Sequence, residues 1–201
     1  MICWLLLTSA IASPHTARVH IINLRHRRDR LASIVRQLAN ATLPATWDMD
    51  IRRVDAVTPR GTQDMQAYPH WKTTSTNARY GRFWSRPVTN GELACFASHV
   101  RALNGVMREP AAMSFVMEDD AEFDPRTFIG RALETQRAVQ LADPQWDVIM
   151  LGYVAMDNRT HDTGMGFSKM GYTYQTHAYL VSTTGARKMV EERDWRHDVT
   201  A

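Results

Sequence analysis

The sequence predicts an α/β fold, with helices covering both faces of a sheet in a single domain. Three observations predict it. Short apolar runs rich in β-branched residues alternate along the chain with segments whose apolar residues recur at the helical period. The chain has 201 residues, of which 44% are hydrophobic, and this is enough for one full core. Internal repeats, low-complexity tracts and domain linkers are not visible in the sequence.

The N-terminal segment, residues 1–17, has two interpretations. An apolar run at residues 2–7 precedes Ala10 and Ala12, whose spacing is that of a signal-peptide cleavage site, but the run is short and lacks a basic start. A secretory signal and a first strand or disordered leader therefore both stay open. The location is open with them: the secretory pathway in the first case, the cytoplasm otherwise. The run is too short to span a bilayer, so we expect no transmembrane span.

The domain, residues 18–201, begins with a predicted strand at residues 19–24 and a helix from about Arg28. The helix carries an apolar stripe of Leu31, Ile34, Val35 and Leu38. A second strand is predicted at residues 49–57. Residues 58–89 hold five Pro and Gly positions without a period, which predicts a long loop. Such a loop is either a lid over a binding site or a fixed surface loop whose aromatic residues pack on the core.

The second half continues the alternation. A helix capped by Asn90 is predicted from the spacing of Leu93, Phe96, Ala97, Val100, Leu103 and Val106. A strand at residues 114–117, a helix opened by Asp124 and Pro125, and a strand at 146–152 follow. After a loop at 153–172 come a strand at 175–181 and a helix at 185–192, capped by Thr183 or Thr184. Ligands of such sheets bind at the carboxyl ends of strands.

The charge balance is mild, with 24 Lys and Arg against 21 Asp and Glu, a net charge of +3 and a pI of about 9.1. Arginines cluster at residues 25–30 without interleaved aromatic residues, so we expect no nucleic-acid binding. Arg27, Arg28 and Arg30 open a helix, where phosphate groups are favoured. We expect them to hold a nucleotide or its phosphates. The alternative is exposed arginines paired with Asp29 and water.

Three adjacent carboxylates, Glu118, Asp119 and Asp120, directly follow the apolar strand at 114–117. Neighbouring carboxylates repel one another unless water or a cation separates them. Hard oxygen ligands suit Mn²⁺ or Mg²⁺, and few protein ligands leave room for a nucleotide diphosphate. We expect Asp120 to bind the metal directly, Asp119 to bind it through water or to contact a ribose, and Glu118 to support the cluster. A solvated acidic turn is the alternative.

Four blocks of sequence, in order, resemble glycosyltransferase family 25, the lipopolysaccharide and procollagen galactosyltransferase-like family. They are IINL at 21–24 with RRDR at 27–30, VDAV at 54–57, GELACFASH at 91–99 and VMEDDA at 116–121. The segments at 146–152 and 177–182 echo later blocks. The resemblance covers residues 18–190, and the ordered set is more specific than any single block.

The resemblance implies a GT-A type, Rossmann-like nucleotide-sugar-binding fold. It implies a hexosyltransferase that moves a sugar, galactose by first expectation, from a nucleotide-diphosphate sugar with Mn²⁺ or Mg²⁺. The acceptor would be a glycan, a lipopolysaccharide or a protein hydroxyl. Asn23 would contact the base or only cap its turn, and Asp55 would contact the nucleotide or only hold a turn. Ser98 and His99 would line the donor pocket, His99 with a catalytic role, or pack in the core.

Departures from the family pattern keep other functions open. Ala94 replaces a usual Gly, and family members continue past the end of this chain, so we expect a C-terminal truncation or divergence. A catalytically inactive nucleotide-sugar or glycan binding module is the main alternative. A nucleotidyltransferase is less favoured, because no GxxxxGK[ST] phosphate loop occurs. The catalytic base is not identified, and Asp194 and Asp198 are candidates by position alone. His177 and Tyr179 are interpreted as core residues.

Overall fold

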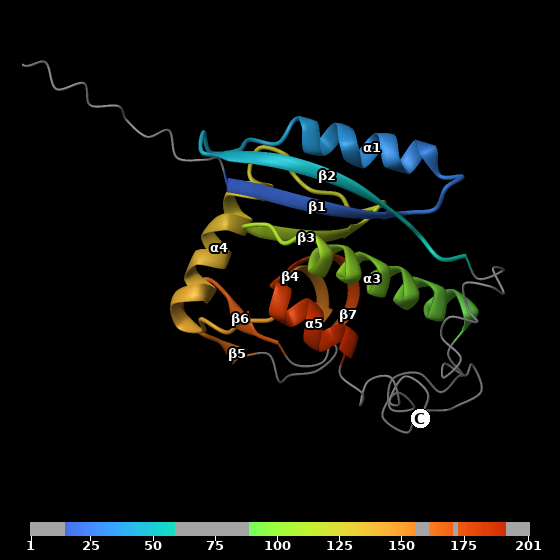
Figure 1. The fold of residues 1–201 in the computed structure, drawn as a ribbon. Coiled ribbons are helices and arrows are strands. Elements are labelled where there is room, and N and C mark those ends of the chain that lie inside the picture. The colour runs from blue at the N-terminus through green and yellow to red at the C-terminus, as the bar shows by residue number, and fades with distance from the viewer. Residues whose placement is uncertain (1–14, 59–88, 156–160, 171–172, 192–201) are drawn as a thin grey trace, which may run out of the picture.

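The computed structural model describes residues 15–58, 89–155, 161–170 and 173–191 (Figure 1). Strands and helices alternate as far as residue 155, and three more strands then follow before the last helix. The chain thus has the predicted α/β class. The elements are β1 His15–Asn23, α1 Arg28–Ala39, β2 Trp47–Asp55, α3 Asn90–Arg108, β3 Met113–Glu118, α4 Phe128–Ala142, β4 Val148–Ala155, β5 His161–Asp162, β6 Ser168–Lys169, β7 Thr173–Val181 and α5 Thr183–Glu191. Most of the predicted leader, the predicted loop from 59 to 88, and Asp194 and Asp198 lie outside the described residues.

The main sheet has five strands in the order β2-β1-β3-β7-β4. β1 runs parallel to both β2 and β3, whereas β7 runs antiparallel to β3 and β4. The sheet is therefore mixed. The stretch predicted as a loop at 153–172 is partly regular, because β4 extends into it and β5 pairs with β6 as a separate antiparallel ribbon.

The pairing register gathers several strand ends at one edge of the sheet. Asn23, the last residue of β1, lies opposite Asp55, the last residue of β2. Glu118 ends β3 opposite Ile22. Because β7 is antiparallel to β3, the first half of β7 lies at this same edge, with Ala178 opposite Met117. Chain segments far apart in sequence thus meet beside the acidic cluster.

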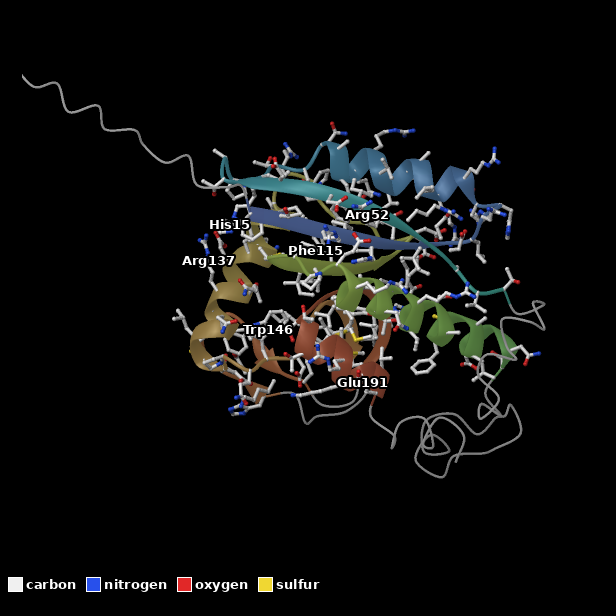
Figure 2. The ribbon with its side chains drawn as sticks, in the orientation of Figure 1. His15, Arg52, Phe115, Arg137, Trp146 and Glu191 are labelled. Carbon is white, nitrogen blue, oxygen red and sulfur yellow. The ribbon has the colours of Figure 1, made fainter. Side chains whose placement is uncertain are left out.

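Alternating side chains of the strands fill two cores, one on each face of the sheet. One core packs β1, β3 and β7 against α1 and α4, and Phe115 lies fully buried within it (Figure 2). The other packs Val116, Tyr179 and Val181 against α3 and α5, which lie side by side in Figure 1. Both faces are covered, as the sequence predicted. Within the described ranges, no helix is long and apolar enough to cross a membrane.

The N-cap of helix α3 lies one residue before the predicted cap. Thr89, not Asn90, is the N-cap, and its hydroxyl accepts a hydrogen bond from the Glu92 N–H. The Glu92 carboxylate accepts one in return from the Thr89 N–H, which completes a capping box. Asn90 becomes the first helical residue. The prediction erred because Thr and Asn are both good caps and the Glu three residues after Thr89 selects between them.

The caps of α4 and α5 also differ from prediction. Asp124 caps a preceding turn, where its carboxylate accepts a hydrogen bond from the Arg126 N–H, and α4 itself starts after Thr127. At α5, the Ser182 hydroxyl accepts a hydrogen bond from the Gly185 N–H, so Ser182 performs the role predicted for Thr183 or Thr184. These shifts move boundaries without changing the order of elements.

Candidate functional site

The acidic cluster lies where β3 ends and turns. Glu118 is the last residue of β3, and the turn closes with a hydrogen bond from the Ala121 N–H to the Glu118 carbonyl. Arg30 contacts both Asp119 and Asp120, whereas Glu118 has other partners but stays close to Asp120. Asp119 is 10% exposed, Glu118 24% and Asp120 43%. Arg30 and the hydrogen bonds to Glu118 offset part of the mutual repulsion that their adjacency in sequence suggested.

Asp119 points toward β1 and α1. Its carboxylate accepts hydrogen bonds from Asn23 Nδ2 at 2.7 Å and from Arg30 Nη1 at 3.3 Å. The same Arg30 nitrogen lies 2.8 Å from Asp120 Oδ2, so one guanidinium neutralises part of both charges. Among the three arginines predicted to bind phosphates, Arg30 is the one whose side chain contacts the cluster.

Asn23 holds Asp119 in place from a buried position at the end of β1. Its Nδ2 also donates to the Arg27 carbonyl at 2.9 Å, and its Oδ1 accepts from Arg53 Nε at 2.9 Å. These partners fix the orientation of the amide. Asn23 therefore caps its turn, as one of its two interpretations proposed, and in addition supports the acidic cluster.

Glu118 points to the opposite side, toward α3 and β7. Its Oε1 lies 3.3 Å from His99 Nε2 and accepts a hydrogen bond from Thr176 Oγ1 at 3.1 Å. His99 Nδ1 lies 3.0 Å from the hydroxyl of Tyr179, which is 2% exposed. Burial opposes ionisation of Glu118, but the hydrogen bonds from His99 and Thr176 outweigh it, so its pKa is lowered. The side chain is therefore an anion at neutral pH.

Glu118, Asp120 and His177 form a group of potential metal ligands. One ligand atom from each lies within 4.8 Å of the others. Two carboxylate oxygens and an imidazole nitrogen suit Mn²⁺ better than Mg²⁺, which prefers oxygen ligands throughout. The core interpretation of His177 does not agree with this position beside two carboxylates, whereas that of Tyr179 is confirmed by its burial.

Glu118 and Asp120 were expected to share one face of a continuing strand. The strand β3 ends at Glu118, so this reason does not hold, but the turn that follows still keeps the two carboxylates close.

The other predicted arginines do not contact the carboxylates. Arg27 forms an ion pair with Asp29 at 2.7 Å, which is the arrangement that the solvent-exposed alternative described. Arg28 is exposed, and the described part of the chain offers it no hydrogen bond or ion pair. A role for these two residues toward phosphates stays a prediction.

Ser98 and Asp55 tie α3 to the end of β2. The buried Ser98 hydroxyl accepts a hydrogen bond from the Val57 N–H at 2.8 Å and donates one to the Ala94 carbonyl at 2.7 Å. Asp55 pairs with Arg53 at 2.6 Å, and Arg101 donates to its carbonyl. Asp55 and both arginines also line a cleft of about 420 Å³ between β2 and α3. Contacts of Ser98 or Asp55 with a donor stay predictions.

Sequence reasoning missed the contributions of Arg53, Thr176 and His177. Nothing local distinguishes them, because their positions follow from strand pairing. Thr176 and His177 lie near the cluster because β7 pairs with β3, and Arg53 reaches Asn23 because β2 pairs with β1. One local feature does occur there. Gln175 has a φ of 73°, in the left-handed region that non-glycine residues rarely adopt. This break in the regular strand immediately precedes the two β7 residues that approach the carboxylates, and such strained positions concentrate at functional sites.

Comparison with known proteins gives consistent relatives. Residues 16–199 match the family model described as glycosyltransferase family 25 (LPS biosynthesis protein). The chain is 29% identical over 184 residues to procollagen galactosyltransferase 1-B of Xenopus laevis, covering 86% of this chain and 28% of the relative. It is 30% identical over 193 residues to the inactive glycosyltransferase 25 family member 3 of Homo sapiens, covering 89% of this chain and 29% of that relative.

The chain thus spans less than a third of the length of these two relatives. One is named for a galactosyltransferase activity and the other is named as inactive, so the names alone do not decide what this chain does. The family model matches residues 16–199, a range that holds the strands of the main sheet except His15, together with the acidic cluster. The chain belongs to glycosyltransferase family 25.

Proposed function

We propose that this domain is a metal-assisted glycosyltransferase that moves a hexose from a nucleotide-diphosphate sugar to a hydroxyl acceptor. The observation that carries the proposal is the convergence of Glu118, Asp120 and His177, each with one ligand atom within 4.8 Å of the others. These residues come from β3, its following turn and β7, so the grouping depends on the fold. Galactose is the first sugar to test, because relatives are procollagen galactosyltransferases.

A bound divalent cation would neutralise the charge that develops on the departing diphosphate. The fold positions the side chains that would bind the cation. Asp120 is the most exposed of the three carboxylates and is the proposed direct ligand, with His177 and Glu118 beside it. Thr176 and His99 keep the Glu118 carboxylate oriented. Asp119 is held by Asn23 and Arg30, which suits contact through water or with a ribose.

We also infer a GT-A type fold. Support comes from the three parallel strands β2, β1 and β3, the acidic cluster directly after β3, and the antiparallel β7 beside it. Arg30 supplies a cation at the start of α1, next to the carboxylates, where a phosphate could replace Asp120 as its partner. The acceptor is proposed only as a glycan, lipopolysaccharide or protein hydroxyl.

An inactive nucleotide-sugar or glycan binding module is the second candidate. Relatives named as inactive match this chain at 30% identity, as closely as the named galactosyltransferases do. Such a module would keep the donor-binding residues without turnover.

The test is a screen of nucleotide sugars with Mn²⁺ or Mg²⁺, with and without hydroxyl acceptors, in which the released nucleotide is measured. We expect Mn²⁺-dependent release from one donor. Asp120→Asn should lower the rate by about two to three orders of magnitude, because it removes a charged ligand. Its fold should persist, since Asp120 is exposed and its pairing with Arg30 is worth little to stability.

Asp124→Asn is the matched control. It makes the same chemical change four residues away, at an exposed carboxylate that caps a turn, and Asn can retain that cap. Full activity in Asp124→Asn with loss in Asp120→Asn supports the proposal. Equal metal-dependent turnover in folded Asp120→Asn would exclude the metal assignment. Donor binding without turnover in the wild type would favour the binding module.

A further inference from the structure

Cys95, His99 and Glu118 form a second group of ligand atoms, each within 4.8 Å of the others. Cys95 and His99 are four residues apart on α3, so they lie on the same face of the helix. Glu118 approaches them from the end of β3. This group has a sulfur, a nitrogen and an oxygen donor, which differs chemically from the group around Asp120 and His177.

We propose that Cys95, His99 and Glu118 bind Zn²⁺ at a second site, which shares Glu118 with the acidic cluster. Thiolate and imidazole ligands favour Zn²⁺ over Mn²⁺ and Mg²⁺. A tetrahedral zinc with bonds of about 2.0–2.1 Å to nitrogen and oxygen places those two atoms roughly 3.3 Å apart. His99 Nε2 and Glu118 Oε1 are 3.3 Å apart. A water molecule would complete the four ligands.

His99 is oriented for this task. Its Nδ1 lies 3.0 Å from the hydroxyl of the buried Tyr179, and this leaves Nε2 facing Glu118. Metal-binding histidines are generally held in this way through their second ring nitrogen, which fixes both tautomer and ring direction. Thr176 Oγ1, 3.1 Å from both His99 Nε2 and Glu118 Oε1, further constrains the pair.

Cys95 is open to the metal, because its side chain is exposed and free of a disulfide. The surrounding protein nevertheless removes part of the water around the thiol. This desolvation, and then the negative charges of Glu118 and Asp120, raise the pKa of Cys95 to about 11, so the thiol is neutral without metal. On binding, the sulfur–hydrogen bond breaks, the proton passes to solvent and a sulfur–zinc bond forms. No oxidation or reduction is involved.

Glu118 belongs to both groups, so the two sites compete. Zinc held by Cys95 and His99 would withdraw Glu118 from Asp120 and His177. If the proposed transferase activity exists, micromolar Zn²⁺ should inhibit it, and Cys95→Ser should relieve the inhibition. This consequence rests on the proposed function, whereas the zinc site itself does not.

The test uses Co²⁺ as a spectroscopic substitute for Zn²⁺, because a cobalt–thiolate bond gives an intense charge-transfer band in the near ultraviolet. The protein is the full chain carrying Cys3→Ser, so that Cys95 is its remaining cysteine, under non-thiol reductant. We expect the band to saturate near one Co²⁺ per chain. Zn²⁺ should erase it, and Mg²⁺ should not.

Variants separate this site from its neighbour. His99→Ala should weaken Co²⁺ and Zn²⁺ binding at least about tenfold, while Asp120→Asn and His177→Ala should retain the thiolate band. Circular dichroism establishes that each variant is folded. Absence of the band in folded Cys3→Ser protein would overturn the proposal, as would a band that survives in His99→Ala at unchanged affinity. Neither result depends on transferase activity, so this inference and the proposed function can fail separately.

Discussion

Single residues at the carboxyl edge differ in how strongly the protein holds them. Asp119 and Glu118 each accept hydrogen bonds from two neighbouring side chains. Asp120 is contacted by Arg30, which is itself 39% exposed. The most weakly held carboxylate is thus the one that can reorganise around a ligand, while the other two provide a fixed frame. His177 completes this picture from β7.

His177 is the residue whose assigned role changed most, and its replacement tests the metal group directly. We expect His177→Ala to weaken Mn²⁺ affinity about 10- to 100-fold, since a ligand is lost while both carboxylates remain. Electron paramagnetic resonance of free Mn²⁺ measures this without an activity assay. His161→Ala, at an exposed position on β5, is the control and should bind as the wild type does. Equal affinity in the two variants would remove His177 from the site.

Among the elements, α5 is positioned by a close backbone contact. Its Gly185 packs tightly against the backbone of Asp147, the residue that precedes β4. A Cβ added at Gly185 would lie 2.3 Å from the Asp147 carbonyl oxygen. The Ser182 N–H donates to the same carbonyl, and Lys188 pairs with the Asp147 carboxylate at 2.9 Å. α5 in turn covers β7 from the side of α3. The contact therefore helps to support the strand that carries His177.

Gly185→Ala should lower the free energy of unfolding by about 1–3 kcal/mol, because the backbone of residue 147 must move to admit the methyl group. Gly130→Ala in α4 is the matched control. Nothing lies within 4 Å of its added Cβ, so we expect no loss, or a gain of about 0.5–1 kcal/mol from the better helix former. Urea denaturation measures both. Equal stability of the two variants would show that the contact near Asp147 relaxes freely.

Local patterns were sufficient to predict most elements, because β-branched runs and helical stripes reflect burial on one face. They were insufficient for two kinds of detail. Cap positions depended on side-chain hydrogen bonds that compete among adjacent Ser, Thr, Asn and Asp residues, as at Thr89. The neighbours of Glu118 depended on strand order: Thr176 follows it by 58 positions and reaches it only because β7 inserts beside β3. The acidic cluster was visible as three adjacent carboxylates, and the family resemblance singled out His99, but neither indicated that Thr176 lies beside Glu118.

At the scale of the whole molecule, His20 links the sheet to α3 and makes global stability depend on pH. It is 3% exposed, and an added Cβ at Gly105 of α3 would lie 3.0 Å from its ring. Its Nε2 has no hydrogen-bond partner in the described part of the structure. Burial, and then the charge of Arg18, lower its pKa from 6.5 to about 4. The ring is therefore neutral in the folded protein at physiological pH.

A lowered histidine pKa means that the unfolded chain binds a proton more readily than the folded protein does. The contribution of His20 to stability is therefore full above pH 6.5 and is lost as pH falls toward 4. The free energy of unfolding should fall by about 3 kcal/mol between neutral pH and pH 4 through this one group. Urea unfolding from pH 7.5 to 4 should show this loss, and His20→Leu should flatten it. If the free energy of unfolding of folded His20→Leu falls with pH as steeply as that of the wild type, other groups cause the pH dependence.

The position of β7 in the sheet also has a consequence for synthesis on the ribosome. β7 is the last strand of the sheet in chain order, yet it lies between β3 and β4, and among the described strands β4 pairs with β7 alone. Until translation has passed residue 181, the nascent chain exposes one open edge on β3 and leaves β4 without a partner. Open edges promote misassociation, so ribosome-bound chains that stop before β7 should recruit chaperones more than chains that include it.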